Sequence, residues 1–165
     1  TIPVNGLFSI PQKELYNMIL DTQCKIIKMI KPGVLRSDLQ KETEILLTKG
    51  MIKLGILKGD YKKLIKGLKH KKYYPHGIGH WMGLDVHDAA PYIDANKKEI
   101  ALKKGMILTI EPGLYISKDD MSVPKRFRGI GIRIEDDILV TNKSYENLSV
   151  KIVKTVKDIE KISFS

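Results

Sequence analysis

The residues best suited to chemistry are four histidines that all fall between positions 70 and 87. Three of them alternate with glycines, in the order His76, Gly77, Gly79, His80, Gly83 and His87. Neutral imidazole is a common metal ligand and carries protons near neutral pH. Glycines disfavour a helix and let the backbone pass close to a ligand. We therefore expect a loop that brings three imidazoles to one rim, although any single histidine could instead be an ordinary surface or core residue.

Two glutamates follow strand-like apolar runs. Glu111 ends the run 107–110 and, by the two-residue period of a strand, shares a face with Thr109. In the run 130–135, isoleucines alternate with a polar face that carries Arg133 and Glu135. A carboxylate in so apolar a strand is costly unless it is paired or binds a metal.

Each glutamate also has a simpler interpretation. Arg133 could pair with Glu135, two residues away on the same face, and Glu111 could be a strand end in water. Asp136 and Asp137 are expected to face solvent or a turn. If the glutamates instead join one histidine, they form a hard, oxygen-rich set that suits Mn²⁺, Co²⁺ or Zn²⁺. Two carboxylates can also bridge a pair of ions, and such pairs activate water for hydrolysis.

The usual zinc patterns are absent from the sequence. It has no His-Glu-x-x-His, the pattern of a zinc-protease helix. A single cysteine, Cys24, excludes a zinc ribbon and an internal disulfide framework, and fits a reducing compartment such as the cytoplasm.

The chain reads as helices first and strands afterwards. Apolar residues at intervals of three and four predict a helix from Pro11 to about residue 30, ended by Pro32 and Gly33. Ser37 and Gln40 indicate a capping box that opens a second helix, which runs to about residue 54. A short third helix is expected over 61–68, and strands over 106–110, 114–116, 129–135 and 137–141. This order predicts one α+β unit in which helices pack on an antiparallel sheet.

The composition fits an ordinary globular chain. The 165 residues carry a formal charge of +10, with 42% hydrophobic residues. Nearly all of the basic excess is lysine spread along the chain, and the densest stretch, 62–72, is expected to be a solvated helix and loop. Nucleic acid is therefore not an expected partner. A membrane is not expected either, because no apolar run approaches the ~20 residues of a spanning helix.

These segments together resemble the metallopeptidases of the pita-bread fold and, among them, the Xaa-Pro aminopeptidase (aminopeptidase P) family. The resemblance rests on the histidine loop 76–88, the strand 108–115 and the strand 128–137, and it extends to 1–6 and 146–148. It implies that His80, Glu111 and Glu135 are metal ligands, with Glu135 bridging two ions, manganese being the expected metal and cobalt or zinc the alternatives.

The resemblance also implies roles around the ions. His76 and His87 would line the substrate cleft and hydrogen-bond the peptide near the scissile bond. Glu111 would also take a proton from the attacking water, and Arg133 would orient the carboxylates, with Tyr115 close by. The implied reaction releases an N-terminal residue that precedes proline, so the implied partner is a peptide with proline in second place.

The sequence departs from the family in one respect. The family's site has five protein ligands, of which two are aspartates that precede the segment matching Thr1, and no aspartate occurs here before Asp21. We therefore expect residues 1–165 to be part of a catalytic domain, without the family's N-terminal domain, with weak metal binding and little activity alone. Its exposed core edge leaves a homo-oligomer open.

Three alternatives remain. A prolidase, a dipeptidase of the same fold, has a similar histidine loop and both glutamates, although the run 123–133 leans toward the aminopeptidase. A pita-bread module that binds without catalysis is the second alternative. A lysine-rich nucleic-acid binder is the third.

Overall fold

The structure, a computed structural model, describes residues 1–162. Two long helices come first, α1 (Ile10–Ile27) and α2 (Arg36–Lys53), followed by the short helix α3 (Tyr61–Lys66) and the 3-10 turn η1 (Lys69–Lys72). Five short strands follow: β1 (Ile107–Ile110), β2 (Gly113–Tyr115), β3 (Gly131–Arg133), β4 (Asp136–Val140) and β5 (Tyr145–Asn147). The 3-10 turn η2 (Lys125–Phe127) lies between β2 and β3, and α4 (Val156–Ile162) ends the described chain. The predicted α+β class is confirmed.

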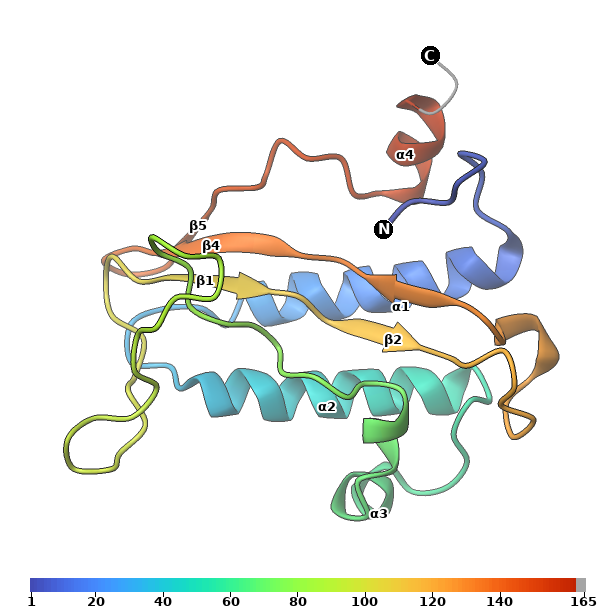
Figure 1. Cartoon of the computed structure of the whole chain (residues 1–165), viewed down its shortest axis with the longest axis horizontal. Coiled ribbons are helices and arrows are strands. Elements are labelled where there is room, and N and C mark those ends of the chain that lie inside the picture. The colour runs from blue at the N-terminus through green and yellow to red at the C-terminus, as the bar shows by residue number, and fades with distance from the viewer. Residues whose placement is uncertain (163–165) are drawn as a thin grey trace.

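The strands form two antiparallel pairs that continue one another. β1 pairs with β4 and places Ile110 opposite Asp136, while β2 pairs with β3 and places Gly113 opposite Arg133. Figure 1 shows β1 leading into β2 alongside the returning chain, and β5 adds a third strand beside β4. The ladder is interrupted where β1 gives way to β2, at a proline that has no N–H to donate.

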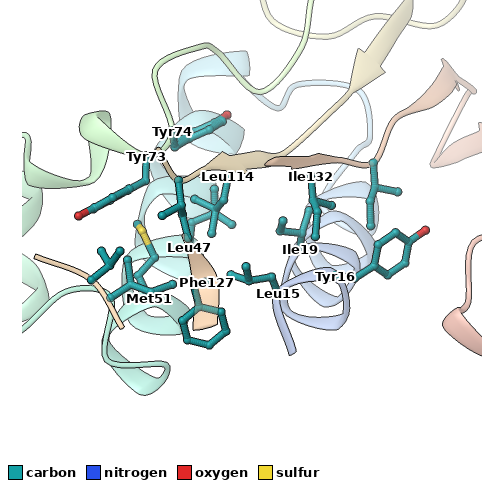
Figure 2. Packing of buried hydrophobic residues seen from close by; sticks show 14 of the residues in the cluster. Leu15, Tyr16, Ile19, Leu47, Met51, Tyr73, Tyr74, Leu114, Phe127 and Ile132 are labelled. Atoms are coloured by element: carbon teal, nitrogen blue, oxygen red, sulfur yellow. The ribbon is translucent and has the colours of Figure 1, made fainter. Parts of the chain in front are cut away.

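The two long helices run side by side along one face of this sheet (Figure 1). Burial of apolar side chains between helices and strands provides the main stabilisation. One cluster joins both helices to β2 and β3 and includes Leu15, Ile19, Leu47, Leu114 and Ile132, as Figure 2 shows. Because side chains alternate along a strand, the odd-numbered residues from 109 to 115 and from 131 to 135 lie on the opposite face of the sheet.

The helix ends differ from the sequence-based expectation. The second helix begins after Leu35, whose side chain makes no capping bond, and Ser37 lies inside the helix with its N–H donating to Glu99. A capping box is instead present at the first helix, between Ser9 and Gln12. The first helix ends at Ile27, a few residues earlier than the proline predicted.

The last segment returns across the molecule to the N-terminal end (Figure 1). Neither β5 nor α4 was expected from the sequence. The Lys154 ammonium lies 2.6 Å from the carboxylate of Asp136, which is 2% exposed and also accepts from the Asn147 side chain at 2.9 Å. The expectation that Asp136 faces solvent or a turn is therefore wrong. Among residues 1–162, no helix combines the length and apolar character needed to cross a bilayer.

Candidate metal centre

The two predicted glutamates lie at the interruption of the strand ladder. The register on both sides of the break is the same, so its continuation sets Glu111 opposite Glu135. The Glu111 N–H donates to the Ile78 carbonyl at 2.8 Å instead of bonding across to the other strand. The Ile134 N–H keeps the cross-strand register and donates to the Pro112 carbonyl at 3.2 Å. Two carboxylates facing one another repel, so this arrangement favours a cation between them.

His80 reaches the same place from the histidine loop. One ligand atom each from His80, Glu111 and Glu135 can be chosen so that all three lie within 4.8 Å of one another. His80 Nδ1 is 3.0 Å from the Trp81 carbonyl, an acceptor, so this nitrogen carries the proton. The other nitrogen, Nε2, faces Glu111 Oε1 at 3.4 Å and can bind a cation through its lone pair when the ring is neutral. A histidine whose outer N–H is held by a carbonyl has the orientation typical of a metal ligand.

The electrostatics of the cluster agree with this geometry. Burial and the negative charge of Glu111 raise the pKa of Glu135, although His80 partly opposes the shift. Glu111 has a side chain only 9% exposed and accepts a hydrogen bond from the Thr109 hydroxyl at 3.1 Å. The residues present therefore fit a hard divalent cation, which would offset the repulsion between the two carboxylates. Their role as ligands stays a prediction.

Arg133 connects the carboxylates to a second group of side chains. Its Nη1 lies 3.2 Å from Glu111 Oε2, and its Nε donates to the Tyr115 hydroxyl at 2.6 Å. The alternative of an Arg133 pair with Glu135 therefore gives way to a pair with Glu111 on the neighbouring strand. Tyr115 lies, as expected, close to this network.

His76 completes the chain of contacts. Its Nε2 is 3.1 Å from the Tyr115 hydroxyl, and its Nδ1 is 2.8 Å from the Gly77 carbonyl. Because the carbonyl only accepts, Nδ1 carries the proton and Nε2 accepts from the tyrosine. Burial, opposed by the bond to Gly77 and reinforced by the charge of Arg133, lowers the pKa of His76. His76 is thus held as a neutral imidazole.

Two glycines allow these groups to meet. A Cβ atom on Gly79 would collide with the Thr109 carbonyl oxygen, so only glycine lets the histidine loop approach β1 so closely. A Cβ atom on Gly113 would lie 2.9 Å from the Tyr115 hydroxyl oxygen and 3.3 Å from His76 Nε2. Gly79, one of the glycines that suggested a ligand-binding loop, thus serves close packing around the site.

The remaining histidines have different positions. His87 is exposed, and its ring lies 4.4 Å from that of His80, edge to face. The loop therefore brings His80 and His87 together, while His76 is linked to His80 through Tyr115, Arg133 and Glu111. His70 is fully buried elsewhere, with Nε2 at 3.4 Å from a carboxylate oxygen of Glu44.

Three polar residues that contact the site were not singled out from the sequence as part of it. The Thr109 hydroxyl accepts from the His80 N–H at 3.0 Å and donates to Glu111. From α2, Gln40 accepts from the Ile78 N–H, and Arg36 donates to the Gly79 carbonyl. Thr109 was detectable from its alternation with Glu111, whereas the contacts of α2 depend on packing between distant segments.

An α+β fold with a candidate metal centre of one histidine and two glutamates is consistent with a metal-dependent enzyme. Comparison with known families identifies which one. The model of metallopeptidase family M24 matches residues 1–142. The chain belongs to metallopeptidase family M24.

Individual relatives agree with this assignment. The chain is 43% identical over 162 residues to a Xaa-Pro aminopeptidase of Haemophilus influenzae, covering 98% of this chain and 37% of the relative. It is also 43% identical over 160 residues to the Xaa-Pro aminopeptidase of Escherichia coli, covering 97% of this chain and 36% of the relative. The chain thus spans little more than a third of the length of the curated relatives it matches.

Solved structures show the same fold. Zinc-substituted E. coli aminopeptidase P in complex with product superposes with a TM-score of 0.92 at 42% identity, covering 99% of this chain and 36% of that chain. Aminopeptidase PepP of Pseudomonas aeruginosa superposes with a TM-score of 0.95 at 39% identity, covering 99% and 37%. The expected pita-bread relationship is therefore confirmed.

Proposed function

We propose that this chain forms part of a metal-dependent exopeptidase that releases an N-terminal residue preceding proline. The observation that carries the proposal is the convergence of His80, Glu111 and Glu135 within 4.8 Å. The proposal is also supported by the similarity to proteins named Xaa-Pro aminopeptidase. The substrate class is a peptide with proline in second position.

The proposed metal is manganese, in a site for two ions, with cobalt or zinc as alternatives. Bound divalent ions would supply a polarised water as nucleophile at neutral pH. His80, Glu111 and Glu135 would hold the ions, and Glu135 would face both. Two further aspartate ligands are expected from a segment that precedes the Thr1 match in the family, so residues 1–165 are proposed to be one part of a catalytic domain that binds metal weakly alone.

The remaining residues have roles that follow from their contacts. Glu111, fixed by Thr109 and Arg133, is placed to accept a proton from the attacking water. The neutral His76 accepts a hydrogen bond from the Tyr115 hydroxyl in the resting site, so either of the two can turn toward a substrate oxygen or nitrogen. His87 is exposed beside His80, and this position supports the proposal that it lines the substrate cleft.

Proline in the substrate sets a specific requirement. The amide between a residue and proline has no N–H, so the site cannot recognise it by accepting a hydrogen bond from that nitrogen. Recognition then depends on the neighbouring carbonyl and on space for the ring. Side chains that can hydrogen-bond the peptide around the scissile bond, such as His76 and His87, suit this requirement.

The test is hydrolysis by the complete gene product with Mn²⁺ added. We expect release of the first residue from a Xaa-Pro-Xaa tripeptide, and much slower cleavage of the dipeptide Gly-Pro. Preference for the dipeptide would indicate a prolidase, and no cleavage of either peptide would favour a binding module. The variant His87→Ala should lower turnover by more than it lowers manganese content, whereas an equal loss of both would point to a structural role.

Two further parts of the proposal concern location and partners. A cytoplasmic location is proposed from the single cysteine, Cys24, which is exposed and suits a reducing compartment. A homo-oligomer is left open and is tested by the mass of the purified protein in solution.

A further inference from the structure

The segment 77–80 contains His80 and directly follows His76. One side of this segment is hydrogen-bonded to β1 and to Glu111, the residue after β1. The Glu111 N–H donates to the Ile78 carbonyl at 2.8 Å, and the Thr109 N–H donates to the His80 carbonyl at 2.9 Å. The Thr109 hydroxyl accepts from the His80 N–H at 3.0 Å. The strand therefore satisfies three of the peptide groups in this segment.

The other side of the same segment is bonded to α2 by side chains. Gln40 Oε1 accepts from the Ile78 N–H at 2.6 Å, and Arg36 Nη1 donates to the Gly79 carbonyl at 2.9 Å. Gln40 and Arg36 are four residues apart and lie on one face of the helix. We call these two contacts the α2 clasp.

Gln40 is itself fixed from behind. Its Nε2 donates to Glu44 Oε1 at 2.9 Å, which also determines the orientation of its amide. Glu44 is paired with Lys71 at 3.0 Å and lies 3.4 Å from His70 Nε2. The polar chain thus runs from η1, just before the histidine loop, through α2 and back into the loop.

Arg36 is fixed by aromatic rings. Its guanidinium carbon lies 4.6 Å from the centre of the Tyr92 ring, and Tyr92 stacks on Trp81 with centroids 5.6 Å apart. The Trp81 carbonyl is the acceptor that orients His80. Gln40 is therefore fixed by Glu44, and Arg36 by the Tyr92 ring. Because both side chains are fixed by groups outside the segment 77–80, they can hold that segment in place.

We propose that Gln40 and Arg36 are positioning residues for His76 and His80. Ile78 lies two residues from each histidine and is fully buried, so without Gln40 its N–H would have no acceptor unless the loop opens to water. The inference rests on the proposed function, because metal affinity is its functional readout. Loss of the polar partners that orient ligands typically weakens metal binding about 10- to 100-fold.

The test compares three variants of the complete gene product. Gln40→Met keeps the length of the side chain but removes the acceptor. The double variant Gln40→Glu/Glu44→Gln keeps an acceptor oxygen for the Ile78 N–H and reverses the bond between residues 40 and 44, so it serves as the conservative rescue. Thr48→Val is the matched control, because Thr48 is a buried polar residue of the same helix, away from the loop.

Two measurements are made on each variant. Hydrogen exchange of the Ile78 amide without metal should be at least about 10-fold faster in Gln40→Met and near wild type in the other two variants. Calorimetric titration with Mn²⁺ should show about 10-fold weaker binding in Gln40→Met only. If Gln40→Met does not fold, Arg36→Met replaces it, and the expected result is a shift of the His76 and His80 ring signals in NMR spectra.

The outcomes separate the two proposals. Unchanged Ile78 exchange in Gln40→Met, or unchanged ring signals in Arg36→Met, would overturn the α2 clasp whatever the metal result. Unchanged manganese affinity despite faster exchange would also overturn it, because the loop would then move without consequence for the site. Faster exchange in a complete gene product whose wild type binds no manganese would support the clasp as a loop anchor and contradict the proposed function.

Discussion

Arg133 pairs with Glu111 on the neighbouring strand and not with Glu135, which lies two residues further along the sequence. The same guanidinium also donates to Tyr115, so one residue joins a carboxylate of the candidate metal centre to the hydroxyl that bonds His76. The sequence could not show this, because the partner of Arg133 depends on the register between two strands.

The coupling between Arg133 and Tyr115 can be measured by a double-mutant cycle. Arg133→Lys keeps the charge but cannot bond Tyr115 and Glu111 in the same fork geometry, and Tyr115→Phe removes the shared hydroxyl. Each change should lower kcat of the complete gene product by about 10-fold, and the pair by much less than 100-fold, because both remove one connection. Arg126→Lys, on an arginine half-exposed beside Glu14, is the control. Fully multiplicative losses would show that the two side chains act independently.

The close approach at Gly79 predicts a sharp difference between two neighbouring glycines. Gly79→Ala forces a Cβ atom against the Thr109 carbonyl and should destabilise the chain by about 1–3 kcal/mol. Gly77→Ala places its Cβ atom 3.5 Å from Arg36 Nη1, an ordinary contact, and should be tolerated. Urea unfolding of both variants checks this, and equal stability would contradict the described packing of the loop on β1.

The ion pair between Lys154 and Asp136 predicts that the last segment stabilises the sheet next to Glu135. Lys154→Met leaves the buried Asp136 carboxylate without its cation and should lower the free energy of unfolding by about 3 kcal/mol. Lys151→Met, at an exposed lysine of the same segment, should change it by less than about 0.5 kcal/mol. Asp136→Asn in the Lys154→Met background should restore part of the loss. Equal effects of the two lysine substitutions would show that the pair contributes nothing specific.

Acid should weaken a contact at the end of η1. Asp120 lies 2.7 Å from the Lys72 ammonium, and bonds from Lys72 and Ser122 hold the pKa of Asp120 well below its usual range. Because the folded pKa is below the value of about 3.9 in an unfolded chain, the stabilisation is present above that pH and is lost as the pH falls further.

The prediction is checked by unfolding at a series of pH values. Asp120→Asn should be less stable than wild type at pH 7, and the difference should shrink steadily below about pH 4. Asp119→Asn, at the exposed neighbouring residue, should show no such trend. A difference that stays constant with pH would mean that the charge of Asp120 is not responsible.

The residues of the candidate site were accessible to sequence reasoning because their chemistry is unusual in their surroundings. A carboxylate at the end of an isoleucine-rich strand is costly unless it is paired or binds a metal. Several histidines among glycines are rare unless they have a functional role. Asp136 was misjudged although the alternation of buried residues continues through it from Ile132 to Val140. If the two-residue period of the strand had been applied strictly, it would have placed Asp136 on the buried face of the sheet.

Other features could not be predicted for physical reasons. Gln40 had a local explanation as part of a capping box, whereas its actual partner, Ile78, lies 38 residues away. Short elements such as β5 and α4 carry too little periodic pattern to stand out, and their positions are set by contacts with distant strands and with the N-terminal segment.

The most direct test of the central claim is an anomalous difference map from a crystal of the chain soaked in millimolar Mn²⁺. The account predicts a peak between His80 Nε2 and the carboxylates of Glu111 and Glu135, at about the 2.0–2.2 Å typical of nitrogen and oxygen ligands to a divalent ion such as zinc. Absence of a peak there, or a manganese peak only at other carboxylates, would contradict it.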